Sequence, residues 1–100
     1  MTQLALEQLT QVLGGYLHED WRCEFESDVS ALRAAVASEP REKIALAISE
    51  IDELLNKSVT EVVLRDLLMG RVGCYFDPDS EGLNYGQWLR RARGVLASER

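Results

Sequence analysis

Apolar side chains recur at every third or fourth position along most of this chain, and this spacing limits the folds that the chain can adopt. The clearest stripe consists of Ile44, Ile48, Ile51 and Leu55, and Glu50 is expected to face away from it. Only an α-helix places residues at such intervals on one face, where they can pack against other helices. The sequence therefore predicts an all-α protein.

Capping signals and turn residues divide the chain into about five expected helices. The first covers residues 3–17, the second runs from Ser27 or Asp28 to residues 38–40, and the third runs from Pro40 to Leu55. The fourth begins with the capping box Ser58–Glu61, ends near Gly70 or Gly73, and directs Val63, Leu64, Leu67 and Leu68 inward. The fifth begins with a second cap formed by Asn84 and Gln87. Between them, residues 18–27 are interpreted as an irregular or short helical connection, residues 72–76 alternate briefly like a strand, and residues 77–82 form a turn-rich loop. We therefore expect residues 1–100 to form a single domain, a compact bundle around one core.

Acidic residues outnumber basic ones, and the two kinds are unevenly distributed. The formal net charge is −6; residues 1–28 carry six acids and one base, whereas residues 86–100 carry one acid and four bases. This balance argues against nucleic acid as a direct partner, because phosphate binding rests on clustered Lys and Arg. An acidic end is suited instead to attract a basic protein.

Nothing in the sequence directs the chain to a membrane or an oxidising compartment. No apolar run approaches the roughly 20 residues of a membrane span, and the N-terminus lacks the features of a signal peptide. We therefore expect a cytoplasmic protein without a membrane partner. Cys23 and Cys74 are too few for a disulfide framework and are expected to be buried free thiols.

The one histidine of the chain, His18, lies beside Glu19 and Asp20, an arrangement that would suit a general base oriented by a carboxylate. However, there is no second histidine to complete a zinc site and no glycine-framed nucleophilic serine. The loop from Asp77 begins like a calcium-binding loop, but its twelfth position, which requires a bidentate glutamate, holds Trp88. We therefore expect no catalytic residue, no metal site and no cofactor.

Four segments carry motifs that point to a family. Residues 15–21 read Gly-Tyr-Leu-His-Glu-Asp-Trp, and residues 48–55, 73–76 and 85–89 follow at similar spacing. Together they resemble bacterial immunity proteins of contact-dependent growth inhibition systems over nearly the whole chain, and the Tyr-x-His-x-Asp-Trp core is the most specific part. The residue after the tyrosine, often Phe in that family, is Leu17 here, a conservative difference. The motif residues are Tyr16, His18, Asp20, Trp21, Tyr75, Trp88 and Leu89.

This resemblance implies a small cytosolic helical protein that binds the toxic C-terminal domain of a delivered effector and blocks its active site. Toxins of this kind are commonly nucleases, whose substrate-binding surfaces must be basic. An acidic immunity protein would meet such a toxin quickly and would place carboxylates where phosphates bind. We therefore expect a monomer without enzymatic activity that joins its cognate toxin domain in a heterodimeric complex.

Charge alone indicates two candidate toxin-binding segments. The first contains Glu19, Asp20, Glu24, Glu26 and Asp28, and the second contains Asp77, Asp79 and Glu81. The motif residues have two open interpretations. Either they belong to this surface, with Trp21 presenting one wet edge at its rim, or they join the first helix to the bundle, with His18 and Asp20 bonded to the backbone or to each other.

Two other functions remain open at this point. A helical regulatory or adaptor module would pair with itself or with another protein, and it would leave an apolar stripe of the bundle uncovered. An RNA-associated protein would use Arg90, Arg91 and Arg93 of the last helix, although arginines near a helix C-terminus are ordinarily a solvated face.

Overall fold

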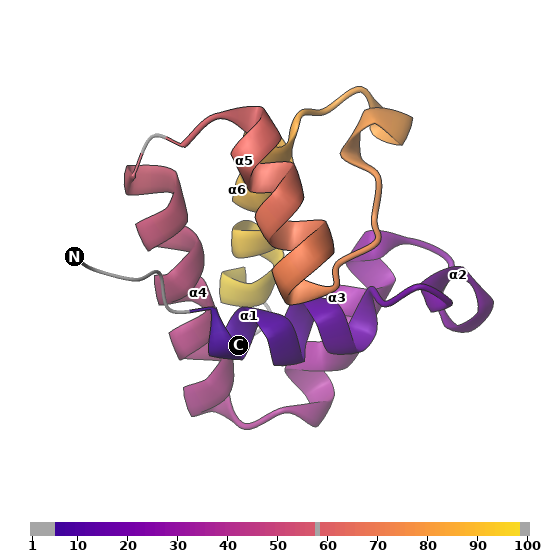
Figure 1. Cartoon of the computed structure of the whole chain (residues 1–100). Coiled ribbons are helices and arrows are strands. Elements are labelled where there is room, and N and C mark those ends of the chain that lie inside the picture. The colour runs from indigo at the N-terminus through magenta and orange to yellow at the C-terminus, as the bar shows by residue number, and fades with distance from the viewer. Residues whose placement is uncertain (1–5, 58, 99–100) are drawn as a thin grey trace.

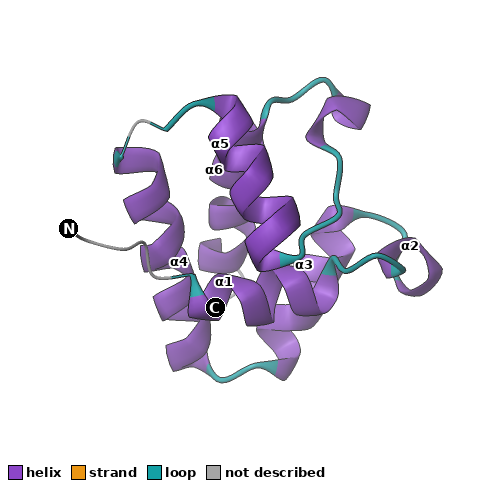
Figure 2. Cartoon of the chain, in the orientation of Figure 1, coloured by secondary structure: helices purple, strands orange, loops and turns teal. Residues whose placement is uncertain are grey.

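Helices supply all the regular secondary structure in residues 6–57 and 59–98, which are the residues that the computed structural model describes (Figure 2). In chain order they are α1 (Glu7–Leu9), the π-helical segment η1 (Thr10–Gly14), α2 (Trp21–Glu24), α3 (Asp28–Ser38), α4 (Arg41–Asn56), α5 (Glu61–Arg65), the π-helical segment η2 (Asp66–Val72), the 3₁₀ turn η3 (Pro78–Glu81) and α6 (Tyr85–Ser98). The all-α prediction is confirmed. Within the same residues, no helix combines the length and apolarity needed to cross a bilayer.

The last helix, α6, lies at the centre of the packing. It contacts α3, α4 and α5, while α1 packs against α4. Figure 1 shows α5 in front of α6 and α1 running across the lower end of the bundle. Trp88, Leu89 and Leu96 of α6 are fully buried, and they meet a core that includes Ile44 and Ile51 of the predicted α4 stripe.

The first helix is continuous from Glu7 to Tyr16, because α1 passes into η1 and two further helical residues without a break. Its predicted stripe is confirmed, since Leu9, Leu13 and Leu17 are all fully buried. The predicted residues 3–5 lie outside the described part of the chain. The connection that follows contains the short helix α2, as the sequence indicated.

The two π-helical segments η1 and η2 cross with their backbones almost in contact. A Cβ atom added at Gly14 would overlap the carbonyl oxygen of Val72, whereas one added at Gly15 would meet nothing within 4 Å. A residue without a side chain is therefore required at position 14. η2 then ends at Gly73, the second of the two predicted stops, whose positive φ of 80° favours glycine.

Residues 73–77 have no regular secondary structure, so the strand-like alternation of residues 72–76 was misleading. Val72 still belongs to η2, and the Tyr75 amide donates a single bond of 2.7 Å to the carbonyl of Leu17. Phe76 is buried and Tyr75 is 46% exposed, so the two rings lie on opposite sides of the segment. This segment is thereby attached to the end of the first helix.

Two helix caps follow the sequence directly. At the start of α3, the Ser27 hydroxyl accepts from the Ser30 amide at 3.1 Å. Before α6, the Asn84 side chain accepts from the Gln87 amide at 2.7 Å and the Gln87 side chain accepts from the Asn84 amide at 3.0 Å. Both predicted caps are confirmed.

The other predicted capping box is wrong for Glu61. Thr60 caps α5 by accepting from the Val63 amide at 3.2 Å, and Ser58 lies outside the described residues. The Glu61 carboxylate reaches a different helix, where it accepts from the amides of Tyr85 at 2.6 Å and Gly86 at 3.0 Å. Glu61 therefore caps the start of α6 rather than its own helix.

Glu50 shows the same behaviour, which corrects its expected outward orientation. Its side chain is buried, and it accepts from the amides of Gln8 at 3.1 Å and Leu9 at 2.9 Å. Amides in the first turn have no acceptor in their own helix, so this carboxylate from α4 satisfies them. Val63 is also corrected: it is 42% exposed, because Leu64 and Leu68 already form the inner face of its helix.

Candidate functional site

The two acidic segments predicted from the sequence lie on the same side of the bundle. Figure 1 shows α2 and the loop that carries η3 on the same side of the molecule. Two contacts join them: the Tyr75 amide bond to Leu17, and an edge-on contact between the Trp21 and Phe76 rings, whose centroids are 5.6 Å apart. Seven of the eight predicted carboxylates are exposed here, namely Glu19, Asp20, Glu24, Glu26, Asp77, Asp79 and Glu81. We call these seven residues the acidic end.

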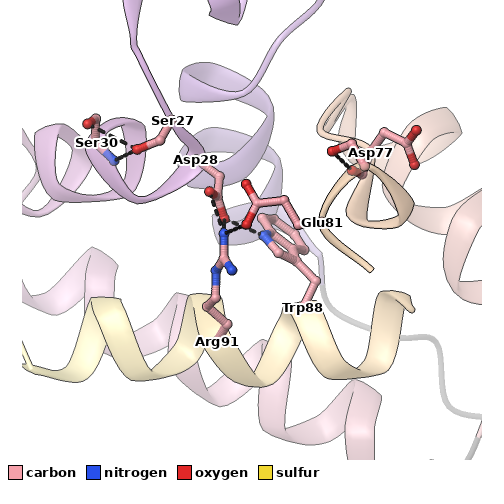
Figure 3. Close-up of polar contacts among 8 residues, drawn as sticks. Ser27, Asp28, Ser30, Asp77, Glu81, Trp88 and Arg91 are labelled. Atoms are coloured by element: carbon pink, nitrogen blue, oxygen red, sulfur yellow. Dashed lines mark hydrogen bonds and ion pairs between the residues drawn. The ribbon is translucent and has the colours of Figure 1, made fainter. Parts of the chain in front are cut away.

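The eighth carboxylate, Asp28, is buried with 1% of its surface exposed, which corrects its placement on the binding surface. Because Ser27 caps α3, Asp28 occupies the first helical position and faces α6. It accepts from the Trp88 indole N–H at 2.7 Å and from the Arg91 guanidinium at 2.7 and 2.8 Å (Figure 3). A buried carboxylate needs such hydrogen-bond partners to offset the loss of its contacts with water.

Arg91 connects this buried carboxylate to the acidic end. The same Nη2 atom that bonds Asp28 also donates to Glu81 at 2.6 Å, so one guanidinium group joins α3, α6 and η3. The hydrogen bond with Asp28, followed by that with Glu81, raises the pKa of Arg91. The loop of Asp77 and Asp79 is therefore fixed to the core through a permanent positive charge.

Three aromatic rings form a row beneath this end. Trp21 meets the edge of Phe76, and Phe76 stacks on Trp88 with centroids 5.1 Å apart. Trp21 is only 6% exposed, and the Arg22 guanidinium lies 5.3 Å from its ring centroid. The expectation that Trp21 presents a wet edge at a rim is therefore wrong, because the ring belongs to the core.

His18 holds the turn that leads into α2. Its Nδ1 accepts from the Asp20 amide at 3.1 Å, and its Nε2 lies 2.9 Å from the Glu24 carboxylate. Since Nδ1 is an acceptor, the proton of the neutral ring is on Nε2 and faces Glu24. This hydrogen bond to the backbone agrees with one of the two interpretations of the motif, in which His18 bonds to the backbone.

Tyr16 joins the first helix to the end of α3. Its hydroxyl donates to Glu39 at 2.8 Å. Burial, together with this bond, raises the pKa of Tyr16, and the same bond lowers the pKa of Glu39. Leu89 is fully buried in the core, whereas Tyr75 is exposed at the acidic end. Among the motif residues, Trp21, Trp88 and Leu89 are buried, whereas Asp20 and Tyr75 are exposed.

The predicted basic face of α6 is largely occupied. Arg91 bonds Asp28 and Glu81, and Arg93 forms an ion pair with Asp52. Arg90 is exposed, whereas Arg91 and Arg93 are half-buried. The two cysteines also differ from expectation: Cys74 is buried, and burial raises its pKa to about 12, but Cys23 is exposed.

Four exposed apolar side chains were not predicted, and one of them, Val62, lines a groove together with Asp77 and Asp79 of the acidic end. Val62, Val63 and Met69 of α5 and η2 are 62%, 42% and 40% exposed, and Tyr75 follows them in the chain. The signal in the sequence was the run Val62-Val63-Leu64, because three consecutive apolar residues span about 200° of a helix and one face cannot bury them all. We call these four residues the apolar strip.

A groove of about 320 Å³ separates α5 from the loop that carries η3. Its lining residues are Glu61, Val62, Arg65, Asp77, Pro78, Asp79, Leu83, Asn84 and Tyr85. Val62 of the apolar strip therefore shares this groove with two carboxylates of the acidic end. Burial, followed by the negative charge of Asp77, raises the pKa of Tyr85.

No group of three or more His, Cys, Asp or Glu side chains within residues 6–57 and 59–98 is arranged to hold a metal ion. The groups exposed in this region include carboxylates, apolar side chains and the Tyr75 ring. Carboxylates and apolar side chains side by side suit the binding of a complementary protein.

Comparisons with known proteins agree with this description. The sequence model of the CdiI immunity protein family matches residues 5–96. Among solved structures, the fold is similar to a chain in the crystal structure of the CdiA-CT/CdiI complex from Y. kristensenii 33638, with a TM-score of 0.83 and 26% sequence identity, over 90% of this chain and 96% of that chain. Among curated protein sequences, none matches.

Proposed function

Because the chain belongs to the CdiI immunity protein family, we propose that it binds the C-terminal toxin domain of a contact-dependent growth inhibition effector and neutralises it in the cytoplasm. The family match confirms the resemblance that the sequence motifs indicated. The protein with a similar fold is part of a CdiA-CT/CdiI complex, which supports a partner of the same kind here. In this proposal the protein acts by binding, without a chemical step of its own.

The proposed binding surface follows from one observation, that the two acidic segments lie on the same side of the molecule. We propose that the toxin domain contacts Glu19, Asp20, Glu24 and Glu26 on one side and Asp77, Asp79 and Glu81 on the other. Carboxylates gathered on one end accelerate the encounter with a basic partner and orient it. Asp28 supports this surface from below and is not part of it.

We further propose that the toxin is a nuclease and that the acidic end covers its active site in a one-to-one complex. A nuclease must hold phosphates, so its substrate-binding surface is basic. A rigid set of exposed carboxylates is complementary to such a surface. The formal net charge of −6 supports this choice of partner.

Co-expression tests neutralisation directly. The toxin domain is taken from the large exoprotein gene that we expect immediately upstream, and it is induced in cells with and without this protein. Growth should stop without the protein and continue with it. Death of cells that contain soluble, folded protein would show that this chain does not neutralise that toxin.

The nuclease proposal has a separate test. The purified toxin domain is incubated with RNA and with DNA, and cleavage is followed while this protein is titrated into the reaction. Cleavage should cease at one equivalent. A toxin that cuts neither nucleic acid, yet is neutralised in cells, would remove the nuclease proposal and leave immunity intact.

A further inference from the structure

The apolar strip and the acidic end meet in the groove between α5 and the loop that carries η3. Val62, Leu83 and Tyr85 supply apolar surface to this groove, and Asp77 and Asp79 supply its charge. Val62 is 62% exposed, which is the largest exposure among the large apolar side chains of the described residues. A valine exposed to this extent beside two carboxylates offers an apolar and a charged contact to another molecule.

The carboxylates around the groove are not equivalent. Both oxygens of Glu61 accept amides at the start of α6, and Glu81 bonds Arg91. Asp77 Oδ1 accepts from the Asp79 amide at 3.1 Å, which fixes the loop and leaves its second oxygen available. Within the described residues, Asp79 has no ion-pair partner. The unneutralised charge of the groove is therefore on Asp77 and Asp79.

We propose that this groove receives a lysine or arginine side chain of the toxin domain, and this inference rests on the proposed function. Such a side chain has an apolar stem and a cationic end. In the groove, the stem would pack on Val62, Leu83 and Tyr85, and the cationic end would pair with Asp77 and Asp79. Charge complementarity selects a basic side chain over an aliphatic one.

One positive charge, Arg65, also lines the groove and has to be accounted for. Its guanidinium lies 3.8 Å from the Asp66 carboxylate and more than half of its side chain is exposed. Pairing with Asp66 offsets its charge, and solvent screens what remains. The incoming cation is therefore expected to approach from the side of Asp77 and Asp79 rather than along α5.

Binding measurements with substituted proteins test this inference. The affinity for the purified toxin domain is measured for Val62→Ala and for Asp77→Asn/Asp79→Asn, in which the amide oxygen introduced at position 77 can still cap the loop. Each is expected to weaken binding by about tenfold, as for a contact near the centre of an interface. Leu46→Ala, another large exposed apolar residue, and Glu42→Gln, an exposed acid on the same helix α4, are the matched controls and should bind within about twofold of the unsubstituted protein.

A double-mutant cycle then identifies the incoming residue. Each surface Lys or Arg of the toxin domain is replaced by Ala and combined with Asp79→Asn, and one of them should show a coupling of about fivefold or more. Unchanged affinity for both groove variants would overturn the inference while neutralisation by the unsubstituted protein stands. Self-association that Val62→Ala abolishes, with toxin affinity unchanged, would overturn it in favour of a second copy of this chain. Absence of toxin binding by the unsubstituted protein would instead refute the proposed function.

Discussion

At the residue scale, Asp28 decides whether the acidic end has a fixed shape. Its carboxylate satisfies an indole N–H and a guanidinium group inside the protein, and the same guanidinium holds Glu81 of the loop. Removing one partner of a buried ion pair is strongly destabilising, because it leaves the other group buried without compensation. A buried residue therefore helps to fix the shape of the proposed binding surface.

Replacing Asp28 by Ala should lower the free energy of unfolding by roughly 3 kcal/mol. The loss should lie at the lower end of what a broken buried ion pair costs, because the Arg91 side chain keeps 33% exposure and water screens its charge. Urea denaturation followed by tryptophan fluorescence measures it. Asp79→Ala, in the exposed loop, serves as the control and should change stability by less than about 0.5 kcal/mol. Equal stabilities of the two variants would contradict the role given to Asp28.

At the element scale, the crossing of η1 and η2 depends on one glycine. Gly14→Ala places a methyl group against the Val72 carbonyl and should destabilise the protein by roughly 2–4 kcal/mol, since backbone atoms cannot move aside as a side chain does. Gly15→Ala, one residue later, meets only open space in a helical conformation and should stabilise it by about 0.5 kcal/mol. The melting temperatures of these two single variants, measured by thermal unfolding, compare the two positions directly. A similar melting temperature for both variants would mean that the crossing adjusts easily.

The glutamate cap of α6 allows a second test at this scale. Glu61→Ala leaves the amides of Tyr85 and Gly86 without their acceptor and should cost about 1 kcal/mol. Asp66→Ala, a neighbouring exposed acid that caps nothing, should cost less than about 0.5 kcal/mol. Amide hydrogen exchange provides the local readout: the first turn of α6 should lose protection in Glu61→Ala only. Retained protection there would assign the cap to another group.

The helices were predictable from the sequence because their signals are local. Apolar spacing located the stripes, and Asn84 with Gln87 marked the start of α6 within four residues. Glu61 and Glu50 were misassigned because each bonds amides that lie far from it in the chain. Periodicity shows which face of a helix is apolar, but it does not show which neighbouring helix end needs an acceptor.

The candidate site was predictable in part for the same reason. Charge counting located both acidic segments, but only the fold shows that they lie on the same side of the molecule and that Asp28 points inward. The apolar strip escaped prediction because Val62 and Val63 occur in a helix whose other apolar residues do face the core. The groove requires two segments to be placed side by side, which no local pattern encodes.

At the scale of the whole molecule, the position of the charge matters more than its sum. Glu19→Lys/Glu26→Lys should slow association with a basic toxin domain by tenfold or more at low salt. Glu7→Lys/Glu42→Lys makes the same change in net charge on α1 and α4, away from the acidic end, and should have a much smaller effect. Stopped-flow association rates at several ionic strengths measure both.

The difference between the two variants should vanish at about 1 M salt, where the Debye length is about 3 Å. Equal rates for the two variants at low salt would show that net charge alone governs the encounter, and would remove α2 from the proposed surface. The affinity is measured in parallel to separate long-range electrostatic attraction from direct contacts in the complex. Long-range attraction changes the association rate more than the dissociation rate.

The cap that Glu50 provides for α1 has a consequence for synthesis of the chain. Gln8 and Glu50 are 42 residues apart, so a ribosome that adds about 5–20 residues per second leaves the first helix without its acceptor for roughly 2–8 s. We therefore expect the first turn of this helix to remain uncapped until α4 has been synthesised. Under the proposed function, a newly delivered toxin would be neutralised by completed molecules that the cell already holds, and not by chains still on the ribosome.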